Sequence, residues 1–174
     1  MKFFTEYKIK VITYYMKYSI INSFNNIEIT DNSLVLCDID ETLLTSKFVK
    51  LKPKENNKPI IKVNLPKYTD KRGFLNLMQK LNRTNSKLCF VTARDIKYFE
   101  FTRKQFKVLG INIENFPVFF CGDTPKGLVI KTKINLSKFK DILFIDDLKY
   151  NLDNVKKELG EKVQCILFEK SNIG

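Results

Sequence analysis

Short, continuously apolar runs recur along the chain, and stretches with helical periodicity separate them. A continuous apolar run of roughly four to eight residues is typical of a strand that is buried on both faces. The runs are residues 34–38, 88–92, 118–121, 142–146 and 163–168. Buried strands that alternate with helices form parallel sheets with helices on both faces. The pattern therefore predicts an α/β fold with a doubly wound, Rossmann-like parallel sheet of about five strands.

The segments between these runs carry helix signals. Thr69 or Asp70 is a suitable N-cap for a helix through about residue 82. A second helix is predicted from about Asp95 to Gly110, and a third ends at Gly160. Residues 126–136 alternate apolar and polar side chains like a strand. Their position between two strands suits a crossover helix, which is the interpretation we favour.

Residues 1–33 are predicted to add an amphipathic helix, which packs on the core formed by residues 34–174. The helical pattern covers residues 3–24, and its apolar positions follow a 3, 4, 3, 4, 3 spacing. These positions are Phe4, Tyr7, Val11, Tyr14, Tyr18 and Ile21. The alternative is that the same face forms the interface of a homodimer.

Composition excludes several classes of site. The 174 residues suit one domain, and the absence of His excludes a Ser-His-Asp triad and any His-ligated metal. The four Cys are far apart, which suits buried side chains in a reducing compartment better than disulfides or a zinc site. No stretch resembles a signal peptide or a membrane span, so we expect a cytoplasmic protein without membrane contact.

The net charge of +12 invites a nucleic-acid interpretation, although a generally basic, solvated surface is the explanation we favour. Residues 45–68 concentrate this charge, with seven Lys against one Glu, and their three Pro predict a basic loop or small hairpin. As a flap at the mouth of a site, this insert would attract anionic substrates, nucleic acid among them. The alternative is a solvated lysine-rich loop.

Polar side chains stand where three of the predicted strands end. Asp38 and Asp40 follow the first strand, Thr92 ends the second, and the pair at 146–147 ends the fourth. Lys126 lies between the second and fourth of these strands. Because parallel strands have their carboxyl ends along one edge, where such folds bind ligands, we expect these side chains to meet in one crevice.

Carboxylates placed side by side repel one another and need a cation. An all-oxygen set without His or Cys selects a hard cation, and Mg²⁺ fits best. Together with a lysine and a hydroxyl group, such an ion forms a site for a phosphoryl group. Asp38 is then a candidate nucleophile, and Asp40 a candidate general acid and base.

These motifs resemble those of the haloacid dehalogenase (HAD)-like hydrolase superfamily, and the resemblance spans about residues 34–168. The order of an Asp motif, a Thr, a lone Lys and an acidic pair is the family's order. The four matching segments are Asp38-Ile39-Asp40-Glu41-Thr42-Leu43, Phe90-Val91-Thr92, Lys126 and Phe144-Ile145-Asp146-Asp147.

The resemblance implies a role for each residue. Asp38 would form a phosphoaspartyl intermediate and bind Mg²⁺, and Asp40 would be the acid and base while its backbone carbonyl also binds the metal. Thr92 would hydrogen-bond the phosphoryl group, and Lys126 would hold nucleophile and phosphate. Asp146 would bind the metal, with Asp147 as a further ligand or its supporting partner.

Three assignments stay open at this point. Lys131 and Lys133 compete with Lys126 for the phosphate-site lysine, because all three lie in one short segment. Arg94 would pair with an acid or contact the substrate. Asn151 would face the pocket or lie exposed on a helix.

The resemblance implies a Mg²⁺-dependent phosphatase that acts through an aspartyl-phosphate intermediate. The insert at 45–68 is too small for a large cap domain, and minimally capped members of the family admit large substrates. One alternative is a non-catalytic HAD-like module that binds nucleic acid or protein through the lysine-rich flap. Another is a phosphatase that acts on nucleic-acid ends.

Overall fold

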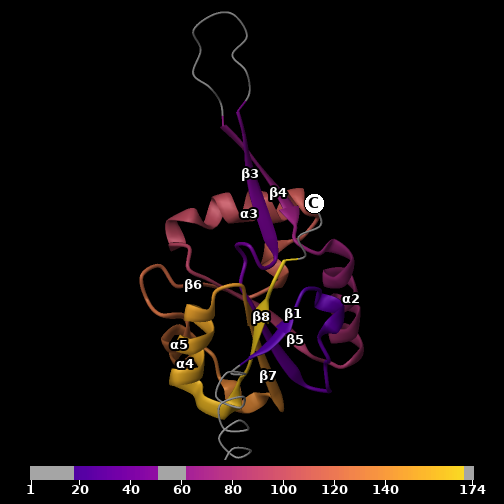
Figure 1. The fold of residues 1–174 in the computed structure, drawn as a ribbon, viewed down its shortest axis with the longest axis vertical. Coiled ribbons are helices and arrows are strands. Elements are labelled where there is room, and N and C mark those ends of the chain that lie inside the picture. Colours follow the sequence, from indigo (N-terminus) through magenta and orange to yellow (C-terminus); the bar gives the residue numbers. More distant parts are fainter. Residues whose placement is uncertain (1–17, 51–61, 171–174) are drawn as a thin grey trace, which may run out of the picture.

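The computed structural model describes residues 18–50 and 62–170, and a six-stranded parallel sheet forms the centre of this part of the chain (Figure 1). The strands lie in the order β1-β8-β7-β2-β5-β6, and every neighbouring pair is parallel. Their bounds are Ser19–Ile21 (β1), Ser33–Cys37 (β2), Lys87–Thr92 (β5), Val118–Phe120 (β6), Asp141–Asp146 (β7) and Gln164–Phe168 (β8). The predicted α/β fold is confirmed, and β1 is a strand that the sequence did not indicate.

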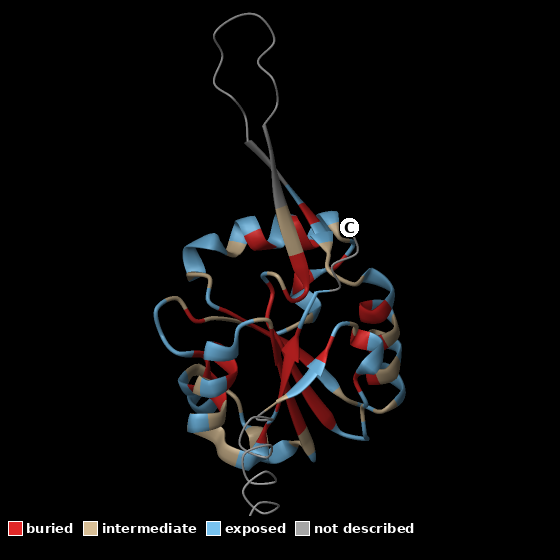
Figure 2. Cartoon of the chain, in the orientation of Figure 1, coloured by how far each residue is buried: buried red, intermediate tan, exposed pale blue. Residues whose placement is uncertain are grey.

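Helices cover both faces of the sheet. Alternate residues of β2 point to opposite sides, so that Val35 packs in one core cluster and Leu36 in the other. The first cluster contains side chains of α2 (Lys71–Arg83) and α3 (Phe99–Val108), and the second contains those of α4 (Lys126–Lys133) and α5 (Lys149–Leu159). Figure 2 shows the central strands buried between half-buried helices. The sheet is therefore doubly wound.

The helix boundaries agree with the local signals. Asp70 caps α2 by accepting a hydrogen bond from the Gly73 N–H, and Gly160 at φ +62° ends α5. The ambiguous segment at 126–136 is helical over Lys126–Lys133, as we favoured. The connection from β6 to β7 is parallel, and it has to cross over β5 and β2, which a helix on the face of the sheet accomplishes.

The predicted N-terminal helix is wrong for the residues that can be compared. Ser19–Ile21 form strand β1, which pairs with β8, and a short 3₁₀ helix follows at Phe24–Asn26. The exposed edge of β8 offers backbone hydrogen bonds to a β-branched segment, and this tertiary pairing outweighs the helical spacing of the side chains. The rest of the predicted helix, including the homodimer face, lies outside the described residues.

The lysine-rich insert forms an antiparallel hairpin of β3 (Leu44–Lys50) and β4 (Lys62–Tyr68), which stands out from the body beside α3 (Figure 1). Ser46 accepts a hydrogen bond from Gln105 of α3 (2.9 Å), and the Tyr68 hydroxyl donates to the Leu109 carbonyl (3.0 Å). These contacts fix the base of the hairpin. Residues 51–61 lie outside the description, and the described residues contain no large cap domain.

All four cysteines are buried and free, as expected of core residues. Within residues 18–50 and 62–170, no helix has the length and apolar character needed to cross a membrane.

Candidate metal centre

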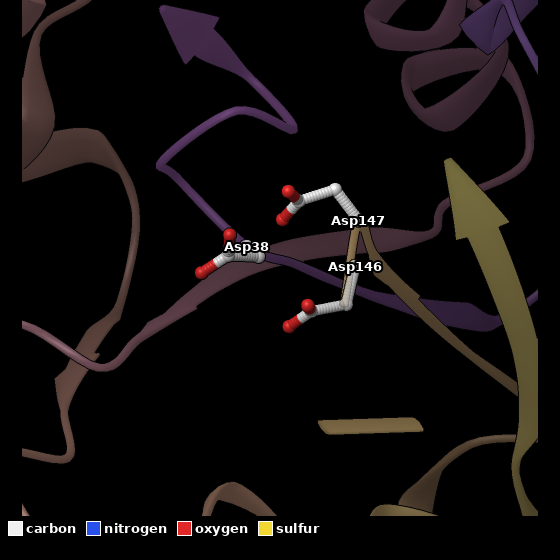
Figure 3. A group of neighbouring side chains, drawn as sticks. All are labelled: Asp38, Asp146 and Asp147. Carbon is white, nitrogen blue, oxygen red and sulfur yellow. The ribbon is translucent and has the colours of Figure 1, made fainter. Parts of the chain in front are cut away.

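The central strands bring two of the predicted acids together. β2 and β7 pair in parallel with Cys37 opposite Ile145, so Asp38 and Asp146 follow at the same level. The Asp38 N–H continues the ladder by donating to the Ile145 carbonyl (2.9 Å). Figure 3 shows the carboxyl groups of Asp38, Asp146 and Asp147 turned to the same side. One oxygen of each lies within 4.8 Å of the others.

Lys126 is the lysine that reaches this cluster. Its Nζ lies 2.5 Å from Asp38 Oδ1 and 2.7 Å from Asp146 Oδ2, and its side chain is only 3% exposed. Lys131 instead pairs with Glu158 on the surface, and Lys133 is exposed. The structure therefore decides which of the three lysines belongs to the acidic cluster.

Close packing of α4 on α5 places Lys126. The Gly127 N–H donates to Asn154 Oδ1 (2.8 Å), and a Cβ on Gly127 would lie only 2.8 Å from the Asn154 carbonyl oxygen. A larger residue would push the start of α4 away from α5. Gly127 thus allows the approach that carries the neighbouring lysine into the site.

The carboxyl groups perturb one another's protonation. Burial raises the pKa of Asp38; Lys126 opposes this shift, and Asp146 and Asp40 add to it. Burial also raises the pKa of Asp147, with a further contribution from Asp146. Burial would lower the pKa of Lys126, but Asp38 and Asp146 outweigh it, and the net shift is upward. One ammonium group therefore faces three carboxyl groups, an arrangement that an additional cation would stabilise.

Asp146 is held in place by α5. The Leu148 N–H donates to its Oδ1 (2.9 Å), and the Asn151 amide contacts both carboxylate oxygens at 3.0 and 3.1 Å. Asn151 is 9% exposed and so faces the pocket, which resolves the alternative left by the sequence. The sequence feature that pointed to Asn151 was its position in the first turn of the helix that follows Asp147. Thr42 in turn donates to Asp147 (3.4 Å).

The Asp40 carboxylate is not one of the three clustered carboxyl groups. Both of its carboxylate oxygens accept hydrogen bonds from Arg94, from Nη2 at 2.6 Å and from Nε at 2.8 Å. The turn that carries Asp40 contains Glu41 at φ +62° and returns to a bridge between Asp40 and Leu44. Metal binding was predicted for the Asp40 backbone carbonyl, and it stays a prediction.

Thr92 ends β5, the other neighbour of β2, and is fully buried. With Phe90 paired to Cys37, it comes two residues beyond that pair, at the same edge of the sheet as Asp38. Its Oγ1 accepts a hydrogen bond from the Arg94 N–H (3.2 Å). Its proposed contact with a phosphoryl group stays a prediction.

The donor set fits a hard divalent cation. Three carboxyl groups on two adjacent strand ends supply oxygen atoms, and no His or Cys is among them. Mg²⁺ binds to one or two protein carboxylates together with waters and phosphate oxygens, so a cluster of this size is sufficient. Zn²⁺ would favour nitrogen or sulfur ligands, which this cluster lacks.

No family model and no curated protein matches the chain. Solved structures with a similar fold include a chain of the Pnkp1/Rnl/Hen1 complex, at 14% identity and a TM-score of 0.51. The alignment covers 89% of this chain and 52% of that one. At this identity the similarity is one of fold, and the chain spans about half the length of its neighbour.

A second solved structure is the N-terminal part of the protein BF1531 from Bacteroides fragilis, which contains a phosphatase domain and was solved with Mg. The identity is 15% and the TM-score 0.48, over 78% of this chain and 35% of that one.

Proposed function

We propose that this chain is a Mg²⁺-dependent phosphatase that acts through an aspartyl-phosphate intermediate. The observation that carries the proposal is the convergence of Asp38, Asp146 and Asp147 within 4.8 Å, with Lys126 bridging the first two. Thr92 and the Asp40–Arg94 ion pair lie at the same edge of the sheet. This combination supplies a nucleophile, metal ligands and positive charge for a phosphoryl group.

Asp38, Asp146 and Asp147 would hold Mg²⁺, together with the Asp40 backbone carbonyl. When bound, the ion supplies positive charge that offsets the carboxylates and the phosphoryl oxygens. Asn151 and the Leu148 N–H orient Asp146 for this purpose. Lys126 adds a second positive charge beside the nucleophile.

Asp38 attacks phosphorus in the first step. Lys126 contacts Oδ1 of Asp38, so Oδ2 is the oxygen that forms the new bond to phosphorus. The bond from phosphorus to the leaving oxygen breaks, and that oxygen takes a proton from Asp40 when it needs one. Thr92 donates a hydrogen bond to a phosphoryl oxygen. Water then cleaves the intermediate, and Asp38 regains its carboxylate.

The purified chain is expected to hydrolyse a generic aryl phosphate in the presence of Mg²⁺. Chelation with EDTA should abolish turnover, and added Mg²⁺ should restore it, because the carboxylates need the cation to accept an anionic substrate. Acid quenching followed by peptide mass spectrometry should find the phosphoryl group on Asp38. A chain without turnover on aryl, nucleotide and peptide phosphates would instead be a non-catalytic binding module.

A second candidate function concerns nucleic acid as the substrate. Exposed aromatic side chains flank the site on both sides: Tyr98 and Phe101 follow β5, and Tyr150 follows β7, the two strands beside β2. Stacking on such rings is a common mode of binding single strands. The hairpin insert at 45–68 adds seven Lys against one Glu. A nucleic-acid chain with a terminal phosphate suits both features.

Under this second function, single-stranded oligonucleotides should bind with an affinity that falls as salt is added, because lysine contacts release counterions. Tyr98→Ala should weaken oligonucleotide binding by about tenfold, as expected for loss of one stacking contact. Leu75→Ala, at an exposed apolar position of α2, is the matched control and should bind normally. Fluorescence anisotropy at several salt concentrations provides the measurement, and salt-independent affinity would contradict the nucleic-acid function.

A further inference from the structure

The side chain of Arg94 holds the carboxylate of Asp40. Arg94 donates from Nη2 to Oδ1 (2.6 Å) and from Nε to Oδ2 (2.8 Å), so the guanidinium engages both oxygens at once. Such a paired arrangement fixes orientation as well as distance. The Asp40 side chain is 50% exposed, so solvent reaches it while Arg94 restrains it.

Arg94 is itself firmly anchored. Its Nη1 donates to Thr102 Oγ1 (2.8 Å), and Thr102, fully buried in α3, donates in turn to the Tyr98 carbonyl (2.9 Å). The guanidinium also lies 5.8 Å from the centre of the Phe101 ring. With a side chain only 11% exposed, Arg94 has little freedom to move. The anchored guanidinium of Arg94 thus positions the half-exposed carboxylate of Asp40.

We propose that Arg94 is a positioning residue, which holds Asp40 as the base for the second half of the reaction. The inference builds on the proposed phosphatase function. A carboxylate that accepts two hydrogen bonds from one guanidinium is held in one orientation, and a base with a fixed orientation is ready to take a proton from the attacking water.

The assisted step is hydrolysis of the aspartyl-phosphate. The water oxygen forms a bond to phosphorus, the bond from phosphorus to the Asp38 oxygen breaks, and its electron pair returns to the Asp38 carboxylate. One water proton passes to Asp40. Misorientation of Asp40 would slow this step, because proton transfer requires a base within hydrogen-bond reach of the water.

A substrate with a good leaving group separates the two half-reactions. Para-nitrophenolate leaves without a proton, so formation of the intermediate from para-nitrophenyl phosphate does not need Asp40. Breakdown of the intermediate does need it. Loss of Arg94 should therefore slow breakdown and spare formation, whereas a group that binds the substrate phosphate would affect formation.

Rapid-quench kinetics with para-nitrophenyl phosphate and Mg²⁺ test the inference. In Arg94→Ala, breakdown should slow by about tenfold or more, while formation stays within about threefold of the original chain. A burst of nitrophenol, close to one equivalent per site, should then precede steady turnover. Arg94→Lys keeps the charge but lacks the paired donors, so it should resemble Arg94→Ala.

Three further variants complete the design. Arg103→Ala removes a neighbouring arginine that pairs with Glu100 on the surface, and both rates should stay unchanged. Thr102→Ser keeps the hydroxyl that anchors Arg94 and should retain normal breakdown. Asp40→Asn should slow breakdown by roughly 100-fold or more, and adding Arg94→Ala to it should cause little further loss.

The possible outcomes are distinct. Equal slowing of both half-reactions, or a rise in KM alone, would overturn the inference, because Arg94 would then contact the substrate. Additive losses in the Asp40→Asn, Arg94→Ala double variant would also overturn it. If the original chain forms no phosphorylated intermediate, the proposed function itself fails, and the positioning role falls with it. Arg94→Lys provides the measurement should Arg94→Ala fail to fold.

Discussion

Asp38→Asn should abolish hydrolysis of aryl phosphates, with a fall in kcat of at least about 10⁴-fold, the order seen when a catalytic nucleophile is removed. Asn has nearly the shape of Asp, but its amide nitrogen is no nucleophile and cannot form an acyl phosphate. The effect is expected to be this large because the buried, Lys126-paired carboxylate of Asp38 is the group that forms the bond to phosphorus.

The fold of Asp38→Asn should remain intact. Burial raises the pKa of Asp38, which means that the charged form is disfavoured in the folded chain, and a neutral amide relieves that cost. Circular dichroism and urea unfolding should therefore match the original chain. Asp123→Asn, at an exposed acid of the loop before α4, is the control and should retain activity. Equal activity of the Asp38 and Asp123 variants would refute the assigned nucleophile.

Lys126→Met should cost about 3–5 kcal/mol in the free energy of unfolding at neutral pH, in addition to most of the activity. Lys126 is the ammonium group between Asp38 and Asp146, and all three side chains are buried. Methionine fills a similar volume without the charge. The two carboxylates would then face each other without a counterion, which is the condition under which a broken buried ion pair costs most.

The loss of unfolding free energy in Lys126→Met should depend on pH. Measurements in EDTA separate this loss from any effect of metal binding. Burial raises the pKa of Asp38 and Lys126 opposes this shift, so the loss of Lys126 raises the pKa of Asp38 in the folded state further above its unfolded value. The resulting destabilisation is fully present above the folded pKa and disappears below the unfolded value of about 4. Urea unfolding across this range should show the two chains converging as the pH falls.

Lys131→Met is the matched control, since Lys131 lies on the same helix and pairs with Glu158 at the surface. Its effect should stay within about 0.5 kcal/mol. Similar losses for the two lysine variants would contradict the central role of Lys126. So would a Lys126 variant as stable as the original chain at neutral pH.

Much of the fold could be predicted because the signals are local. A continuous apolar run has few alternatives to a doubly buried strand, as in β2 and β7. Asp70 marks the start of a helix through its capping side chain, and Gly160 marks the end of another through its positive φ. The helix predicted over Ser19–Ile21 was wrong because the structure of this segment depends on a distant partner strand. Side-chain spacing favoured a helix, while the vacant edge of β8 lies far away in sequence.

The position of the site was predictable for a topological reason. Parallel strands have their carboxyl ends along one edge, so the acids after β2 and β7 had to be neighbours once both strands lay in the same sheet. The sequence left the partners of those acids open. Asn151 contacts Asp146 from helix α5, and Arg94 contacts Asp40 from the segment after β5, so both contacts depend on how these elements pack.

The amino-acid sequence by itself determined the α/β class, the order of the motifs, and the chemistry of an all-oxygen acidic cluster beside a lysine. Only the tertiary structure decided that Lys126 rather than Lys131 or Lys133 enters the cluster, and that Asp40 turns to Arg94. The reason is that a local sequence pattern determines the secondary structure of its own segment. Which lysine is buried depends instead on how closely α4 packs against α5, a distance set by residues far apart in the chain.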